Sequence, residues 1–159
     1  MRPDLFVIER PGPGSVAIMA RPRGGVWLAD SMDGLRAAGV TTLVSALTPG
    51  EEMELELRDE AAAARRAGLD FVAFPIPDRS VPRVTVARPV LQRLAESVSA
   101  GGYLVAHCRA GIGRSALIAA GVLVLEGADP AAVWDLIESS RGCPVPDTDE
   151  QRQWVNELL

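Results

Sequence analysis

Residues 103–125 read YLVAHCRAGIGRSALIAAGVLVL. Two apolar runs, at residues 103–106 and 116–125, flank a loop that contains two glycines. The first run has the length and composition of a strand that is buried on both faces of a sheet. The second run is apolar all round, which is typical of a helix in the centre of a domain. This stretch therefore predicts a strand, a loop and a buried helix in succession, which is the repeating unit of an α/β fold.

Three other short apolar runs predict strands, at residues 16–19, 41–46 and 71–76. The last two are apolar at nearly every position, so we expect them, like 103–106, to be buried on both faces of the sheet. Helical segments separate the strands, which indicates βαβ units and a mostly parallel sheet flanked by helices. The predicted fold class is α/β, in a single domain over residues 1–159. The order of the strands does not follow from these patterns.

Capping signals and apolar spacing predict five further helices. Asp30 or Ser31 is expected to cap a short helix that ends at Gly39. Thr48-Pro49-Gly50-Glu51 has the form of a capping box with proline at the first helical position, which predicts a helix from there to about Gly68. The other three are a helix with Ala87, Leu91, Leu94 and Val98 on one face, one at about residues 130–140, and one from Thr148 to the C-terminus.

The composition narrows the classes of partner and cofactor. The chain has 159 residues, a net charge of −5 and no lysine, which argues against nucleic acid or an anionic membrane as a partner and excludes lysine-based covalent chemistry. Residues 1–4 lack the apolar core of a signal peptide, and the run 116–125 is too short to span a membrane. We therefore expect a cytoplasmic monomer. With one histidine and two cysteines, Cys108 and Cys143, we expect no metal and no cofactor.

The loop between the strand and the helix carries the chemistry. A loop that runs into a helix N-terminus points backbone N–H groups inward and so binds a tetrahedral oxyanion. Gly111 and Gly113 are expected to allow close approach of the backbone and positive φ. Arg114 offers a planar fork of donors for two phosphate oxygens. The same positive field favours the thiolate of Cys108, a nucleophile directed at phosphorus.

The other residues of the loop have supporting parts in this prediction. Ser115 can donate a hydrogen bond to the sulfur and help it leave when a phosphoenzyme is hydrolysed. His107 is predicted to bind nearby backbone and shape the loop, a structural part rather than a catalytic one. The residues expected to bind the phosphate of the substrate are Arg109, Ala110, Gly111, Ile112 and Gly113.

The segment His107-Cys108-Arg109-Ala110-Gly111-Ile112-Gly113-Arg114-Ser115 resembles the signature of the protein tyrosine phosphatase superfamily, nearest its small dual-specificity branch. The resemblance implies a phosphatase fold and a two-step hydrolysis through a phosphocysteine intermediate without metal. It also implies a general acid upstream of the cysteine, and Asp78 is the candidate because it follows a predicted buried strand on a proline-rich loop. A turn aspartate paired with Arg79 is the alternative. Gln151 matches a family glutamine that orients water, but it also completes a capping box with Thr148.

Other functions remain open at this level. The substrate is expected to be a phosphorylated protein or a small phosphate ester, and a phosphoinositide, nucleotide or sugar phosphatase on the same fold is an alternative. A non-catalytic phosphate-binding module is another, although such modules usually lose the cysteine, the arginine or the acid. Rhodanese-like enzymes lack the upstream acid, and low-molecular-weight phosphatases carry their cysteine near the N-terminus. Cys143 is either an unreactive thiol or a resolving thiol for Cys108.

Overall fold

The structure, a computed structural model, describes residues 2–159. Met1 belongs to the predicted domain and to the segment 1–4 considered as a signal peptide, and it lies outside the described residues. A five-stranded sheet forms the centre, and its strand order is β1-β2-β5-β3-β4. The pairs β2·β5, β5·β3 and β3·β4 are parallel, and β1 is antiparallel to β2. The strands are β1 (Phe6–Ile8), β2 (Ser15–Met19), β3 (Thr42–Ser45), β4 (Asp70–Ala73) and β5 (Tyr103–His107).

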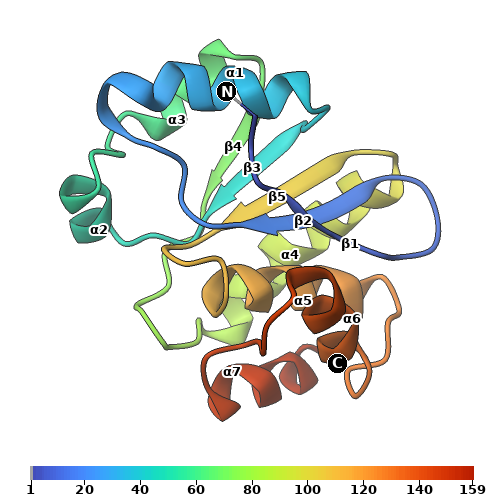
Figure 1. The fold of residues 1–159 in the computed structure, drawn as a ribbon. Helices are drawn as coiled ribbons and strands as arrows, with labels where there is room; N and C mark the ends of the chain where they lie inside the picture. The colour runs from blue at the N-terminus through green and yellow to red at the C-terminus, as the bar shows by residue number, and fades with distance from the viewer. Residues whose placement is uncertain (1) are drawn as a thin grey trace.

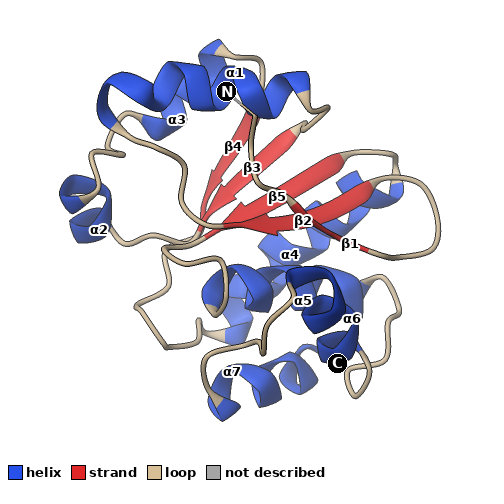
Figure 2. Cartoon of the chain, in the orientation of Figure 1, coloured by secondary structure: helices blue, strands red, loops and turns tan. Residues whose placement is uncertain are grey.

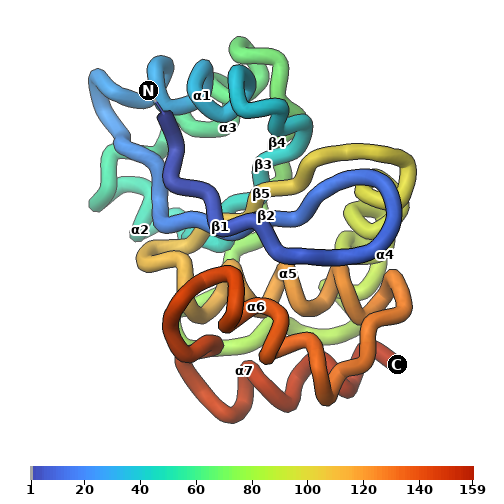
Figure 3. The backbone as a smooth tube through the Cα atoms, turned by 45° about the vertical axis from the view of Figure 1, so that its right-hand side comes forward, coloured from blue at the N-terminus to red at the C-terminus, as the bar shows by residue number. Residues whose placement is uncertain are grey.

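Helices cover both faces of this sheet. They are α1 (Leu28–Ala37), α2 (Pro49–Glu54), α3 (Glu60–Arg66), α4 (Val84–Ser99), α5 (Arg114–Leu125), α6 (Val133–Arg141) and α7 (Asp149–Trp154), with 3-10 turns η1 (Gly25–Trp27) and η2 (Val155–Leu158). One face packs against α1 and α3, and the other against α4, α5 and α6 (Figures 1 and 2). In Figure 3, α7 lies beyond α5 and α6, away from the sheet. The predicted single α/β domain with a mostly parallel sheet is confirmed.

The buried side chains follow the repeat of two residues in the strands and of 3.6 residues in the helices. Along β2, Val16 and Ile18 face the α4–α5 side, and Ala17 and Met19 face the α1–α3 side, because neighbouring strand residues point to opposite faces. Every residue of α5 except its last is buried, as predicted for a central apolar helix. The predicted face of α4 is confirmed as well, since its four members are all at most 5% exposed.

The sheet differs from the prediction at its two edges. The strand β1 was not predicted, because three residues with one buried side chain give no clear pattern. The strand predicted at 71–76 is β4, which ends at Ala73, and the expectation that both its faces are buried is wrong. Its residues are exposed or half-buried because β4 is the edge strand beside β3.

Two helix predictions are wrong at their boundaries. The helix expected from Thr48 to about Gly68 is broken into α2 and α3, and Glu56 has a φ of +57° between them. The break lets Leu57, 1% exposed, enter the core on the α1–α3 side. Asp30 and Ser31 do not begin α1, which starts at Leu28 directly after η1.

The carboxyl ends of the four parallel strands meet at one edge of the sheet, and α2 lies at this edge (Figure 1). In open α/β sheets this is the edge at which ligands bind. The loop that follows β5 and the loop that follows β4 both begin here. Among the helices within residues 2–159, none is long and apolar enough to cross a membrane.

Candidate active site

Residues 108–113 connect β5 to α5, and groups outside this loop bind most of its carbonyl oxygens. Within the described chain, the backbone N–H groups of residues 109–113 donate to no protein atom. With the carbonyls held elsewhere, these N–H groups are available to an anion, as a nest at a helix N-terminus requires. The carbonyl–donor pairs are Cys108 with His107 Nδ1 (3.2 Å), Arg109 with Arg21 N (3.2 Å), Ala110 with Arg141 Nη2 (3.3 Å), Gly111 with Arg141 Nε (2.9 Å) and Gly113 with Leu117 N (3.0 Å).

Cys108 opens the loop, and its side chain is almost fully buried, with 3% exposed. Its sulfur lies 3.3 Å from Oγ of Ser115, which is fully buried in the first turn of α5. A thiol donates to a hydroxyl oxygen, whereas a thiolate accepts from the hydroxyl proton. Ser115 is thus placed to stabilise the negative charge on the sulfur.

Arg114 is the first residue of α5 and is 2% exposed. Its guanidinium donates from Nη1 and Nη2 to the two carboxylate oxygens of Glu51, at 2.6 and 2.9 Å, and from Nη1 to the Ile76 carbonyl at 2.9 Å. Among the described residues Nε–H has no partner. The edge formed by Nε and Nη2 is therefore left for a ligand, and Nη1 is used to fix the orientation of the fork.

Glu51 and Arg114 hold each other in the charged state. The hydrogen bonds from Arg114 lower the pKa of Glu51 from 4.5 to about 2, against the opposing effect of burial. Burial by itself would lower the pKa of Arg114, but its hydrogen bonds and charge interaction with Glu51 outweigh burial and raise it. The predicted capping box is present, so the Glu51 carboxylate binds the Thr48 backbone N–H at 3.1 Å as well as Arg114.

Asp78 lies on the loop after β4, and the structure brings it to the signature loop. Its Oδ1 is 3.4 Å from Nη2 of Arg114, and its side chain is 63% exposed. The carboxylate thus stands at the mouth of the site, on the open side of the arginine. The next residue, Arg79, has a φ of +60°, a conformation that costs a non-glycine residue energy and is often found at functional sites. Among the described residues, the ion pair of Asp78 is formed with Arg114 and not with Arg79.

Arg109 is exposed at the mouth rather than directed at the sulfur. It donates to Glu54 on α2 at 2.7 Å, and its side chain is 43% exposed. Ion pairs this open contribute little, so the guanidinium is free to exchange its partner for a substrate anion. Ile112, half-buried, packs against the α4–α5 core, and Ala110 is exposed.

The structure requires glycine at positions 111 and 113 for different reasons. Gly111 has a φ of +73°, as predicted, and a Cβ there would lie 2.7 Å from the backbone at the end of β2. Gly113 has a φ of −92°, so the expectation of positive φ is wrong at this position. A side chain at Gly113 would instead collide with Asp147 and crowd Gln151.

Gln151 is fully buried beside Gly113 and binds two segments of backbone. Its Oε1 accepts from the Asp147 N–H and its Nε2 donates to the Ser80 carbonyl, both at 3.1 Å. Thr148 caps α7 as predicted, but Gln151 does not return a bond to Thr148, so that half of the predicted capping box is wrong. Because Ser80 belongs to the loop that carries Asp78, Gln151 ties this loop to α7.

Next to Cys108 in the sequence, His107 is fully buried, and its Nε2 lies 2.5 Å from Oε2 of Glu60, the first residue of α3. Cys143 is a free thiol, half-buried against the α4–α6 side of the core. In the range 2–159, no three or more His, Cys, Asp or Glu side chains gather where they could hold a metal ion.

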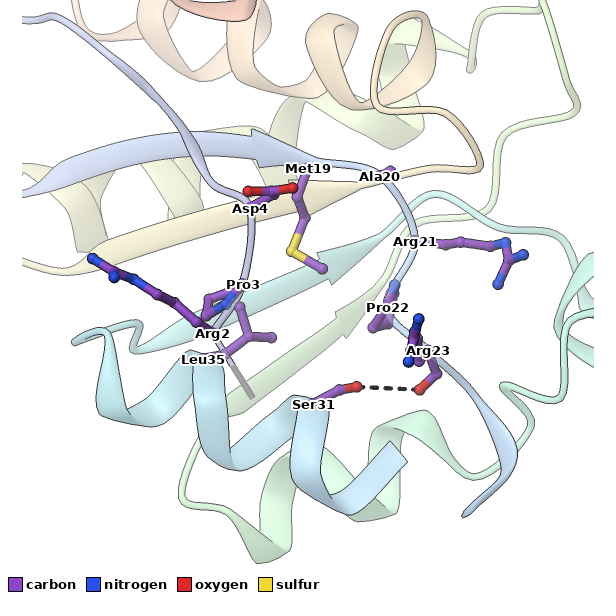
Figure 4. A pocket seen from close by; sticks show the side chains of 10 residues that line it. All are labelled: Arg2, Pro3, Asp4, Met19, Ala20, Arg21, Pro22, Arg23, Ser31 and Leu35. Atoms are coloured by element: carbon purple, nitrogen blue, oxygen red, sulfur yellow. Dashed lines mark hydrogen bonds between the residues drawn. The ribbon is translucent and has the colours of Figure 1, made fainter. Parts of the chain in front are cut away.

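A cavity of about 210 Å³ lies next to the site, between the N-terminal segment, the end of β2 and α1 (Figure 4). Met19 points into it, and Arg21 points away from it. The segment at Ala20 and Arg21 lines this cavity, and its Arg21 N–H also binds the Arg109 carbonyl of the signature loop.

Residues 17–128 match the profile of a family described as "Polymorphic toxin system, DSP-PTPase phosphatase". The chain belongs to this family. It is thereby a member of the cysteine-based protein tyrosine phosphatase superfamily, and its fold is the small dual-specificity fold. The match includes the signature loop and Asp78.

One curated protein is similar in sequence, and two solved structures, both under 25% identical, share the fold. Cyclin-dependent kinase inhibitor 3 of Rattus norvegicus is 24% identical over 126 residues, which cover 78% of this chain and 59% of the rat protein, so the chain spans about three-fifths of that relative. Kinase-associated phosphatase, solved with its catalytic cysteine replaced by serine, matches 99% of this chain and 97% of its own with a TM-score of 0.87 and 17% identity. Tk-PTP in its active form matches 96% and 95%, with a TM-score of 0.76 and 23% identity.

Three residues of the site were not found from the sequence: Glu51, Glu60 and Arg141. Glu51 was noted only as a capping residue, and the others were not singled out. The sequence contained one signal for an acidic partner of Arg114, because a buried arginine requires a carboxylate. That rule does not say which of the many acidic residues supplies it.

Proposed function

We propose that this chain is a phosphoric monoester hydrolase of the protein tyrosine or dual-specificity type, which acts through a phosphocysteine intermediate on Cys108. The observation that supports this most is the meeting of two loops. Arg114 follows β5 and Asp78 follows β4, yet their side chains are 3.4 Å apart at the mouth above the buried sulfur. An anion site, a nucleophile and a carboxylic acid are thus combined.

In the first step, the phosphate oxygens bind the free N–H groups of residues 109–113 and the Nε–Nη2 edge of Arg114. The Cys108 thiolate attacks phosphorus, an S–P bond forms, and the P–O bond to the leaving group breaks. Asp78 gives its proton to the departing oxygen. Its exposure suits this part, because the leaving group lies on the solvent side of the phosphate.

In the second step, water attacks phosphorus, the S–P bond breaks, and inorganic phosphate leaves. Asp78, now a carboxylate, accepts the proton of the water, and Ser115 donates to the departing thiolate. Both polar ends of the Gln151 side chain bind backbone, so we propose that it holds the Asp78 loop over the site. Its direct role in orienting water stays a prediction.

The substrate class is the finer part of the proposal. Arg109 offers a cation at the mouth for an acidic group beside the phosphate. The relative named kinase-associated phosphatase makes phosphoproteins the first substrates to test. Parallel assays with phosphotyrosine, phosphoserine and phosphothreonine peptides, phosphoinositides, nucleotides and sugar phosphates separate this proposal from the alternatives on the same fold.

The chemistry is tested with para-nitrophenyl phosphate in the presence of EDTA. Wild type is expected to turn over and to be inhibited by vanadate, whereas Cys108→Ser should lose at least about 10³-fold in kcat, because an alcohol is a poor nucleophile here. Cys143→Ser is the matched control and should keep full turnover. Activity in Cys108→Ser would refute the mechanism, and an inactive wild type that still binds phosphate would identify a binding module.

The role of Asp78 is tested with Asp78→Asn, which keeps the size and removes the proton. The expected loss in kcat is about 10²-fold or more for a phenyl phosphate with a poor leaving group, and smaller for a good one. The limb of the pH–rate profile that reports the acid should disappear. Asp70→Asn, at the opposite end of β4, is the control. An unaltered pH–rate profile in Asp78→Asn would exclude it as the acid.

A further inference from the structure

One ion pair at the mouth of the site joins the signature loop to α2 and has no part in the steps above. Arg109 donates from Nη2 and Nη1 to the two carboxylate oxygens of Glu54, at 2.7 and 3.3 Å. This is the two-pronged contact that an arginine makes with the carboxylate or phosphate of a ligand. Both side chains are open to solvent, with 43% and 60% exposed. The Glu54 carboxylate thus stands where an external anion would bind Arg109.

The helix α2 does not depend on this ion pair for its position. Thr48 caps its first turn, and Glu51 binds the buried Arg114. Leu57, in the segment after α2, lies in the core on the α1–α3 side. An ion pair as exposed as that of Glu54 contributes little free energy, so an incoming carboxylate can displace it at little cost.

A second arginine, Arg21, adjoins this pair. Its backbone N–H binds the Arg109 carbonyl at 3.2 Å, and its side chain points away from the neighbouring cavity (Figure 4). The side chain is exposed and has no hydrogen-bond or ion-pair partner among the described residues. The hydrogen bonds and charge of Arg109 lower the pKa of Glu54 most, the charge of Arg21 adds to this, and burial and Glu51 oppose it. Two arginines from different segments therefore stabilise one carboxylate.

The surface next to these arginines fits a polypeptide. Residues 21–27 run from the signature loop to the turn after α2, where the Gly25 N–H binds the Glu56 carbonyl at 3.0 Å. At the end of this segment, Val26 and Trp27 are 91% and 52% exposed. Exposed apolar side chains beside an anion position suit a peptide, which carries acidic and apolar residues in one chain, better than an isolated anion.

We propose that Glu54 is a specificity-determining residue: it occupies an anion position formed by Arg21 and Arg109, and it yields this position to an acidic residue beside the phosphorylated residue of a protein substrate. This inference rests on the proposed function and narrows its substrate class to phosphoproteins with acidic residues next to the phosphorylated one. The phosphate binds the loop N–H groups and Arg114, while the acidic side chain replaces Glu54 at the two arginines. A neutral substrate leaves Glu54 in place and gains nothing from them.

Binding is measured in a Cys108→Ser background, so that the peptide is not hydrolysed during the titration. The probes are two fluorescein-labelled phosphotyrosine peptides, one with glutamate and one with glutamine on both sides of the phosphotyrosine. Fluorescence anisotropy gives a Kd for each peptide. The acidic peptide is expected to bind about threefold more tightly than the neutral one, a modest factor because exposed ion pairs are weak.

Variants test the two sides of this anion position. Glu54→Gln should widen the ratio of the two Kd values about threefold further, because the competing side chain loses its charge, and Arg21→Gln should narrow it towards one. Glu96→Gln and Arg93→Gln are the same changes at exposed positions of α4 and should leave the ratio unchanged. About 0.5 M NaCl should narrow it as well, because salt screens exposed charges. A ratio that Glu54→Gln does not change would refute the role of Glu54.

Turnover in the active enzyme separates this proposal from the proposed function. If the Kd values follow expectation but neither peptide is hydrolysed, the phosphatase function fails and the anion position stands. If both peptides are hydrolysed with the same kcat/KM in wild type and in Glu54→Gln, the phosphatase function stands and Glu54 has no part in choosing the substrate. A soluble inositol bisphosphate that displaces the neutral peptide more strongly than the unlabelled acidic peptide does would overturn the assignment to protein substrates.

Discussion

Single residues in the signature loop are constrained by what lies next to them, and Gly111 shows this most directly. Its φ of +73° excludes most side chains, and the end of β2 fills the place of a Cβ. A side chain at Gly111 would therefore be destabilising for two reasons: its backbone would be strained, and its Cβ would collide with Met19 and Ala20. Gly127, just after the far end of α5, has a φ of +109°, so a side chain there would strain the backbone but would collide with nothing.

The pair Gly111→Ala and Gly127→Ala separates these costs. Gly127→Ala is expected to lose about 1 kcal/mol of unfolding free energy and no activity. Gly111→Ala should lose more than about 2 kcal/mol and at least about tenfold in kcat/KM, because the loop must move away from β2. Chemical denaturation and para-nitrophenyl phosphate assays measure both. Equal activity in the two variants would contradict this account of the loop.

The sequence predicted which residues would lie together where a local motif names them, and it did not where a residue is defined by its partner. Cys108 and Arg114 stand in one motif between a strand and a helix, and Asp78 follows a strand on a proline-rich loop. Glu51 and Glu60 become part of the site only because the chain breaks between α2 and α3. Nothing in the stretch 51–66 indicates this, since a continuous helix suits the same residues.

At the level of elements, α6 supports the loop from outside through Arg141. Its guanidinium donates to the carbonyls of Ala110 and Gly111 and lies 4.1 Å over the ring of Phe6 on β1. The edge strand β1, which the sequence did not reveal, thus contacts Arg141 through Phe6. We call these contacts of Arg141 with Phe6 and with the two loop carbonyls the clamp. Three residues are too few for a period to show, so β1 could be recognised only from its pairing with β2.

Replacing this guanidinium while keeping most of the stem tests the clamp. Arg141→Met is expected to weaken competitive inhibition by inorganic phosphate about tenfold, because two loop carbonyls lose their donors and the N–H groups are less well oriented. Arg152→Met is the matched control, since Arg152 also stacks on an aromatic ring, Trp134, and binds a backbone carbonyl away from the loop. Similar inhibition constants in the two variants would argue against the clamp.

For the whole molecule, the Glu51–Arg114 pair joins α5 to the ends of β3 and β4, because Nη1 also approaches the carbonyls of Ala46 and Ile76. The overall arrangement was predictable from alternating strands and helices. The strand order was not, because it depends on which crossover connections pack best. Through Arg114 the candidate site is thus connected to three elements of the fold.

The Glu51–Arg114 ion pair predicts that the folded protein loses stability at low pH. The pKa of Glu51 is about 2 in the folded protein and 4.5 without its partner, so its contribution is fully present above pH 4.5 and is lost as the pH falls towards 2. Glu51→Gln should therefore be less stable than wild type at pH 7 by on the order of 2–3 kcal/mol, with the difference shrinking below pH 4.5. Urea denaturation across pH 2–7 measures this. Glu96→Gln should differ little from wild type throughout, and a gap between wild type and Glu51→Gln that stayed constant down to pH 2 would show that the ion pair is not its source.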